Sequence, residues 1–323
     1  MTPDAGRWLI VTIDTEVDCD RRWRVSNPPA FRSVTEGIPR LLTPLFEAHG
    51  VAPTYLLSAE VIEEPACVAV LRRLDARTEL GTHLHAEFVE PQRRLFRGTM
   101  GGAVHGALQR QYPRDVEATK LERLTRLFEE AFGRRPTAFR AGRYGMSEDT
   151  LAILARLHYR ADSSVTPGLR WDYPEGVVDY RGWSTRPTWV DTAAGSILEL
   201  PISIRPASWL APIVGGWPPS ARAVATRLVG RAAGYRWLRP SWADGEELVR
   251  WVEESADEVL VMMLHSTEVV PGASPYAATP ADVRRIVGAM ETLFHHWRAR
   301  GQGFCTMTNA AVHLSRAPEP AFA

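Results

Sequence analysis

Glu79-Leu-Gly-Thr-His83-Leu-His85 is a short apolar run that ends in two histidines placed two residues apart. The run predicts a strand, and because side chains alternate along a strand, His83 and His85 should project to the same side. Two imidazoles at the end of a strand can form half of a metal site, although a His-x-His pair also occurs by chance.

Length and composition place the chain among ordinary soluble globular proteins. Its 323 residues are enough for one large α/β domain or two small ones, and 45% of them are hydrophobic and 24% charged. Basic and acidic residues balance at 38 each. This balance argues against a nucleic-acid or anionic-membrane partner, which would normally demand a basic surplus, but it leaves room for a local basic patch.

The cysteines and the apolar runs indicate a cytoplasmic protein. Cys19, Cys67 and Cys305 are widely spaced and form no Cys-x-x-Cys motif, which favours a reduced interior over a disulfide framework. The first residues lack the pattern of a signal peptide, and the run at residues 259–264 is too short to span a bilayer. We therefore expect no membrane span.

Short apolar segments alternate with helix-like segments, as in βα units around a parallel sheet or barrel. No linker or repeat divides the chain, so we expect a single domain over residues 1–323 with its core at about 7–310. Residues 87–113 show no periodicity and are predicted to be a long loop. Strands are predicted at 7–14, 53–58, 78–83, 137–140, 159–163, 197–204, 258–265 and 304–307, and helices at 36–49, 67–75, 114–132, 147–157, 221–234, 245–255 and 280–300.

Ionisable residues follow several of these strands. Asp14 and Glu16 end the first strand, Arg140 ends another and His265 a further one. Taken singly, each has a structural interpretation as a turn cap, a solvated loop residue or half of a surface ion pair. Together with the two histidines they favour one common site, because ligands and catalytic groups in parallel α/β folds gather at the carboxyl ends of strands.

Five segments in order resemble the motifs of the polysaccharide deacetylase (NodB-homology) family, also called carbohydrate esterase family four. The resemblance runs from about residue 8 to about residue 310. It implies a distorted (β/α)-barrel of about seven strands and the removal of acetyl groups from N-acetylated sugars with a divalent metal, often zinc. The segments are Thr12-Ile-Asp14-Thr-Glu16, Gly81-Thr-His83-Leu-His85, Phe139-Arg140-Ala-Gly-Arg-Tyr144-Gly, Ala161-Asp162-Ser-Ser-Val-Thr-Pro167 and Leu264-His265-Ser-Thr-Glu268.

The resemblance also implies roles for individual residues. Asp14 would be the general base, Arg140 the partner that keeps it ionised, and His265, on the opposite strand, the general acid. His83 would bind the metal, which keeps open positions for water and for the substrate carbonyl. Backbone N–H groups near Tyr144 could complete an oxyanion site.

Two departures from the family pattern leave alternatives for the metal ligands. Thr15 stands where a second aspartate is common, so we assign Glu16 as the carboxylate ligand, with Asp14 as the alternative. The second histidine commonly lies four residues after the first, where this chain has Glu87, so we favour His85 as ligand over Glu87. The Asp-x-Glu and His-x-His forms resemble a divergent branch of the family.

Other residues carry weaker expectations. Asp162 either orients the catalytic pair or pairs with a nearby arginine. Glu268 could line the pocket but is expected to be an ordinary loop residue. Tryptophans in predicted loops could stack on sugar rings or fill the core; they are Trp23, Trp171, Trp183 and Trp217.

We therefore predict a metal-dependent amidohydrolase, with zinc as the expected metal, that de-N-acetylates a sugar-containing substrate. The alternatives are a hydrolase of another linear amide or of an acetyl ester, and an inactive glycan-binding homologue. For a cytoplasmic protein, a small glycoside, a lipid-linked sugar or a biosynthetic intermediate is a better substrate than intact cell-wall polymer.

Overall fold

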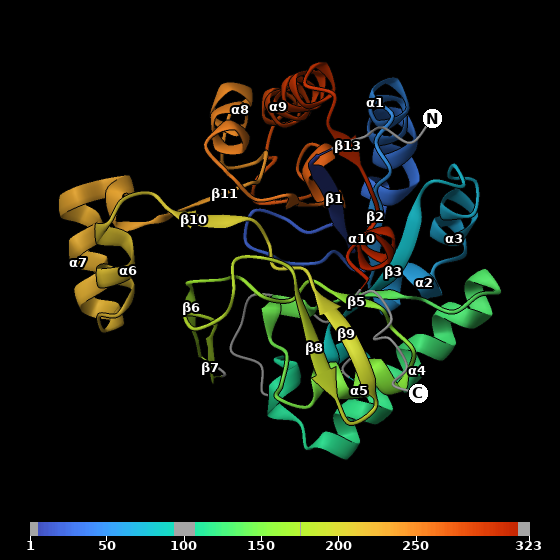
Figure 1. Ribbon diagram of the computed structural model, residues 1–323. Helices are drawn as coiled ribbons and strands as arrows, with labels where there is room; N and C mark the ends of the chain where they lie inside the picture. The colour runs from blue at the N-terminus through green and yellow to red at the C-terminus, as the bar shows by residue number, and fades with distance from the viewer. Residues whose placement is uncertain (1–5, 94–106, 175, 316–323) are drawn as a thin grey trace, which may run out of the picture.

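A curved sheet forms the centre of the molecule (Figure 1), seen here in a computed structural model that describes residues 6–93, 107–174 and 176–315. The strand order is β12-β1-β2-β3-β4-β5-β9-β8, with β13 also paired to β1. All neighbours in this sheet are parallel except β8, which is antiparallel to β9. The strands are β1 (Trp8–Thr15), β2 (Thr54–Leu57), β3 (Glu79–Leu84), β4 (Ala138–Ala141), β5 (Ala161–Asp162), β8 (Thr188–Thr192), β9 (Gly195–Glu199), β12 (Val259–His265) and β13 (Gly303–Phe304).

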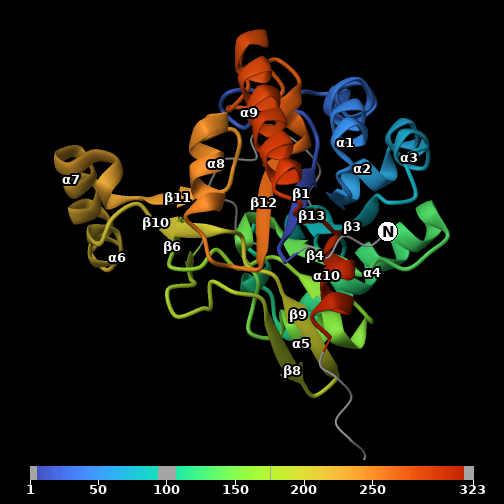
Figure 2. The ribbon, with the colours of Figure 1, turned by 45° about the horizontal axis from the view of Figure 1, so that its top comes forward.

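Helices cover the outer face of this sheet and one of its ends (Figures 1 and 2). At that end Met307 and Ala310 of α10 pack against Ile10 and Leu56, which point into the barrel. The helices are α1 (Thr43–His49), α2 (Ala59–Glu63), α3 (Pro65–Leu71), α4 (Arg114–Phe132), α5 (Thr150–Arg156), α8 (Gly245–Glu253), α9 (Pro280–Ala299) and α10 (Met307–His313), preceded by a π-helix at Ser33–Leu42.

Alternation along β1 explains why one face of the sheet is apolar at one end and ionisable at the other. Ile10, Thr12 and Asp14 share a face because side chains alternate. Ile10 belongs to the buried apolar cluster at the α10 end, whereas Asp14 lines a cavity at the opposite end. Parallel register places His265 beside Asp14. The carboxyl ends of the strands thus present ionisable side chains to a cavity, and α10 covers the opposite end of the barrel.

Most predicted strands lie within about two residues of the observed ones, but residues 197–204 are not one strand. β9 ends at Glu199, and the chain then crosses to β12, where Ser203 N donates to Val261 O at 3.0 Å. Pro201 has no N–H to continue a ladder, which accounts for the break. The crossing segment fills the space between β5 and β12.

Several other elements differ from the predictions. The predicted helix at 36–49 is a π-helix followed by α1. Of the predicted strand at 304–307, only residue 304 lies in β13; residues 305 and 306 belong to no element, and residue 307 begins α10. Within the predicted loop at 87–113, residues 94–106 lie outside the described part of the chain. Elements that were not predicted include α2, β8 and the two-stranded sheet of β6 (Arg170–Tyr173) with β7 (Gly176–Asp179).

A helical arm projects from the barrel (Figures 1 and 2). It spans residues 207–234 and contains α6 (Leu210–Gly215), α7 (Pro219–Val229) and a 3-10 helix, Gly230–Ala233. A ribbon of β10 (Ile204–Pro206) and β11 (Tyr235–Trp237) joins it to the barrel. Among the described residues, no helix has the length and apolar character needed to cross a membrane.

Candidate active site

The ionisable residues at the strand ends meet in one cavity of about 380 Å³. Asp14, Glu16, His83, His85 and His265 all line it, so the structure brings together five of the residues predicted from the sequence. Aromatic side chains form much of the remaining wall; they are Trp23, Tyr144, Trp171, Tyr173, Trp237, Trp242 and Tyr276.

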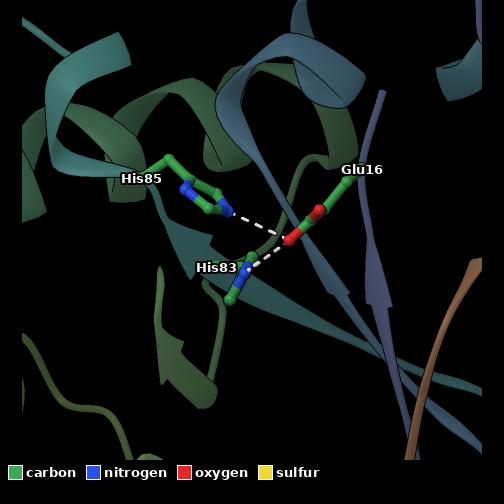
Figure 3. Close-up of side chains that lie close together, drawn as sticks. All are labelled: Glu16, His83 and His85. Atoms are coloured by element: carbon green, nitrogen blue, oxygen red, sulfur yellow. Dashed lines mark hydrogen bonds and ion pairs between the residues drawn. The ribbon is translucent and has the colours of Figure 1, made fainter. Parts of the chain in front are cut away.

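Glu16, His83 and His85 form the group best suited to hold a metal ion (Figure 3). One oxygen of Glu16, Oε1, lies 2.9 Å from His83 Nε2 and 3.0 Å from His85 Nε2. All three residues are buried, and their ligand atoms lie within 4.8 Å of one another. Two imidazoles and one carboxylate are a common ligand set for a catalytic divalent metal such as zinc.

The hydrogen bonds of His83 test whether a cation fits between these residues. His83 Nδ1 lies 3.0 Å from the backbone carbonyl oxygen of Arg140. A carbonyl only accepts, so Nδ1 carries the proton, and a neutral ring presents the lone pair of Nε2 to Glu16. Two facing acceptors need a proton or a cation between them. The donor chemistry therefore fits a metal at this position.

The charge distribution supports the same conclusion. Burial acts to raise the pKa of Glu16, but the neighbouring His85 and His83 outweigh it, and the pKa lies well below its usual value. Burial acts to lower the pKa of His83, but Asp14 and Glu16 outweigh it, and the pKa is raised. The pocket holds a concentrated negative charge that stabilises a positive one beside it.

His85 and Glu87 have different surroundings, which bears on the choice between them as ligand. Glu87 Oε1 accepts from Arg143 Nη1 at 2.6 Å and lies outside the convergent group. His85 faces Glu16 with Nε2, and its Nδ1 lies 3.3 Å from Arg143 Nη1. The geometry favours His85 as the second imidazole ligand, with Glu87 neutralising Arg143.

Asp14 and Arg140 form a buried ion pair beside the metal-binding group. Arg140 Nη1 donates to Asp14 Oδ1 at 2.6 Å, and neither side chain is more than 3% exposed. Arg140 is held by Ser163 O at 2.7 Å, Ser163 Oγ at 2.9 Å and Thr12 Oγ1 at 2.9 Å. Burial acts to raise the pKa of Asp14, but Arg140, His83 and His265 outweigh it and lower the pKa. Asp14 is thus kept ionised, and Arg140 occupies one of its oxygens.

His265 lies directly beside Asp14 and not across the barrel from it. The expectation of an opposite strand is wrong, because β12 pairs with β1 and places His265 in register with Asp14. His265 Nδ1 lies 2.9 Å from Glu268 Oε1, and Glu268 also accepts from Arg239. Burial acts to raise the pKa of Glu268, but Arg239 and His265 outweigh it and lower the pKa to about 2. Arg239 Nη2 also lies 3.0 Å from His265 Nδ1, so Glu268 and Arg239 both hold this nitrogen and leave Nε2 toward the cavity.

Tyr144 lies in a strained turn at the cavity wall. Arg143 and Tyr144 both have positive φ, at 51° and 55°, which non-glycine residues rarely adopt. The Tyr144 ring stacks on Trp171, with ring centroids 5.8 Å apart. Trp23 and Trp171 line the cavity, while Trp183 and Trp217 lie elsewhere. The turn thus places Arg143 and Tyr144 in the cavity wall beside Trp171.

Asp162 lies below the cavity and does not line it. It accepts from Ser164 Oγ at 2.7 Å and from Ser164 N at 3.1 Å. Burial raises the pKa of Asp162, and burial and Asp162 together raise that of Glu199 well above its usual value. Burial and the neighbouring carboxylate thus favour the protonated form of Glu199 beside Asp162. Among the described residues, no hydrogen bond joins the Asp162 side chain to Asp14 or to an arginine, so any effect of Asp162 on the Asp14–Arg140 pair is indirect.

Two residues that line the cavity, Arg239 and Tyr276, and a third that contacts His265, Glu268, were missed or undervalued in the sequence. Glu268 was expected to be a loop residue, although its position three residues after His265 on a 3-10 helix (Ser266–Val269) brings the two side chains together. Arg239 follows β11, in a region without sequence periodicity, and Tyr276 lies in a loop. Arg239 Cζ lies 4.5 Å from the centre of the Tyr276 ring. No local sequence pattern predicts the contact between Arg239 and Tyr276.

No family profile and no curated protein matches the sequence. Solved structures do match. PuuE allantoinase aligns with a TM-score of 0.57 and 12% identity over 99% of this chain and 94% of its own. Two provisionally assigned polysaccharide deacetylases also align. The one from Pseudomonas aeruginosa PAO1 has a TM-score of 0.53 and 13% identity over 96% of this chain and 91% of its own. The one from Mycobacterium smegmatis has a TM-score of 0.50 and 15% identity over 100% of this chain and 98% of its own.

These alignments cover nearly the whole chain, and at 12–15% sequence identity they establish similarity of fold. They confirm the expected fold class, a distorted (β/α)-barrel. The protein has the fold of the polysaccharide deacetylase (NodB-homology) family.

Proposed function

We propose that this protein is a metal-dependent hydrolase that removes an N-acetyl group from a sugar-containing substrate. The observation that carries the proposal is that Glu16, His83 and His85 converge in the same cavity as the Asp14–Arg140 pair and His265. The metal ligands, the general base and the general acid of such a hydrolase each correspond to residues of suitable chemistry in this cavity. The fold of the polysaccharide deacetylases supports this choice.

Glu16, His83 and His85 would hold the metal, which when bound supplies a Lewis acid and lowers the pKa of water. Asp14, ionised and anchored by Arg140, accepts the proton of the attacking water. His265 delivers a proton to the leaving amine from Nε2, because Glu268 and Arg239 both contact the other nitrogen. Backbone N–H groups of the turn at Tyr144 are proposed to stabilise the developing oxyanion.

Asp162 is proposed to position the Asp14–Arg140 pair indirectly, through Ser163 and Ser164. Ser164 Oγ donates to Asp162 and accepts from Ala141 N at 2.9 Å, and neighbouring Ser163 binds Arg140. Asp162 therefore helps to fix the segment that carries the contacts of Arg140. This is an indirect role, in place of direct contact with Asp14 or with an arginine.

The aromatic walls of the cavity support a substrate with faces to stack on. Sugar rings have apolar faces, and Tyr144, Trp171 and Trp237 form a cluster with ring centroids about 6 Å apart. Hydrolysis of another linear amide at the same centre is the second candidate. The fold is shared with PuuE allantoinase, so it is not restricted to polysaccharide deacetylases.

A screen of acetylated sugars and sugar nucleotides for acetate release tests the proposal, with and without a chelator. Acetate release that chelation abolishes and added zinc restores would support it. Release from non-sugar amides alone would favour the second candidate. Bound metal with no hydrolysis of any amide or ester would indicate an inactive glycan-binding homologue.

A further inference from the structure

We propose that the arm, residues 207–234, docks the protein on the surface of an anionic lipid bilayer. The docking is an interfacial contact and does not depend on the chemistry proposed for the cavity.

Large apolar side chains are concentrated on the outside of the arm. Of the ten that are exposed in the described chain, six belong to the arm; they are Trp209, Ile213, Trp217, Val224, Leu228 and Val229. Trp209 is 75% exposed and Leu228 80% exposed. Such a concentration marks an interaction surface, whereas single exposed apolar residues are normal.

The interior of the arm is made of small residues. Val214 of α6, Ala225 of α7 and Ala233 of the following 3-10 helix form its buried cluster. The larger side chains of Trp209 and Leu228 are not part of this cluster and are largely exposed. The arm therefore has a small buried core and exposes its large apolar side chains to solvent. Amphipathic elements that bind at a lipid interface expose apolar side chains in the same way.

The charge of the region selects an anionic partner. From residue 200 to residue 243 the chain has six arginines and no Asp or Glu, although the whole chain has no net charge. Arg222 pairs with Asp172, and the ribbon arginines Arg205 and Arg236 pair with Glu254. Arg239 is buried in the cavity wall and pairs with Glu268, so it does not contribute to the surface charge. Arg227 on α7 is exposed, and within the described residues no carboxylate forms an ion pair with it.

A second copy of the chain fits this surface less well than a bilayer does. A symmetric contact would place two arms that lack carboxylates against each other, with Arg227 facing like charge. In a bilayer, Trp209 and Leu228 can insert at the boundary between head groups and acyl chains, and the arginines can bind lipid phosphates. Exposed tryptophans are also favoured at the membrane–water boundary.

The base of the arm connects this surface to the cavity. Trp237 of β11 lines the cavity and packs with Ile204 of β10 in one buried cluster. Figure 1 shows β10 and β11 leading from the barrel to α6 and α7. A docked arm therefore holds the cavity wall near the lipid surface.

The test is sedimentation of the full chain with vesicles of phosphatidylcholine, alone or mixed with phosphatidylglycerol. We expect binding to the mixed vesicles that weakens between about 0.05 M and about 0.5 M salt. The double variant Trp209→Ser with Leu228→Ser should bind at least roughly tenfold more weakly, since each buried CH₂ contributes about 0.8 kcal/mol, or about fourfold. Its matched control is Trp183→Ser with Val312→Ser, which removes exposed apolar groups elsewhere and should bind as the wild type does.

The charge component is tested with Arg227→Glu. It should weaken binding at low salt by roughly fivefold or more per unit of charge, from about 1 kcal/mol per arginine near an anionic surface. Arg73→Glu, at an exposed position just after α3 on the other side of the barrel, is the control and should have little effect. Circular dichroism of each variant establishes that it is folded.

Three outcomes would overturn the proposal. These are absence of wild-type binding to mixed vesicles, equal loss in the control variants, and equal binding to neutral vesicles. Self-association of the wild type without vesicle binding, abolished by the Trp209 and Leu228 changes, would assign the surface to a second copy. Brominated lipids provide an independent measure, because they should quench the wild type more than Trp209→Phe.

Discussion

Replacing Arg140 by Met tests whether Asp14 is a buried, ionised carboxylate held by one partner. Arg140 is fully buried and makes four hydrogen bonds, of which the 2.6 Å contact to Asp14 Oδ1 is the charged one. Methionine keeps much of the volume and removes the charge. Breaking a buried pair by removing one partner costs about 3–5 kcal/mol, because the remaining charge is uncompensated.

The pH dependence of this loss has a definite sign. In the wild type the pKa of Asp14 is lowered in the folded state, so its contribution is present above the unfolded value near 3.8 and is lost as pH falls through the folded value. Without Arg140, burial dominates and the folded pKa of Asp14 rises. The variant then gains stability as pH falls through that raised value. The deficit relative to wild type should shrink on acidification, by about 1.4 kcal/mol for each pKa unit.

Urea unfolding at pH 7.5 and pH 5, after chelation so that metal affinity does not contribute, measures both effects. Asp14→Asn combined with Arg140→Met is the control, because it leaves no buried charge at this position. The double variant should be more stable than Arg140→Met alone at pH 7.5. A loss below about 1 kcal/mol in Arg140→Met, or no recovery in the double variant, would refute the buried-pair description.

Two further predictions concern the positions of His85 and His265. A Cβ on Gly142 would lie 2.7 Å from Leu84 O and 3.0 Å from His85 Nδ1. Gly142→Ala should therefore weaken zinc binding in calorimetry by about 10–100-fold, whereas Gly182→Ala, with open space at its Cβ, should not. Glu268→Gln should leave zinc affinity unchanged and lower kcat more than it raises KM, because the tautomer of His265 loses its ionised partner. An unchanged kcat would show that Glu268 does not orient His265.

The sequence was most informative where side chains alternate on parallel strands. The strand period alone places His83 on the inward face, and it places Asp14 on the same face as the apolar Ile10. The order of the strands then determines which strand ends are adjacent. The pairing of β12 with β1 is a long-range contact, and no local pattern indicates that His265 lies beside Asp14 and not across from it.

Residues that reach the cavity from irregular segments could not be placed in this way. Arg239 and Tyr276 carry no periodic signal, and their positions depend on how loops cross the barrel. The end of β9 at Glu199 reflects a local rule, the missing N–H of Pro201, that hydrophobic pattern alone does not reveal. The arm was predicted only as a helix at 221–234, without its exposed apolar surface.

In the proposed site, Glu16, His83 and His85 hold a divalent metal while Asp14 remains free to act as base. Metal analysis of the purified chain and its variants by mass spectrometry tests it directly. We predict about one zinc per chain in the wild type, retained in Asp14→Asn and Glu87→Gln and lost in Glu16→Gln, His83→Gln and His85→Gln. Loss of metal in Asp14→Asn with retention in Glu16→Gln would contradict the account and exchange the roles of the two carboxylates.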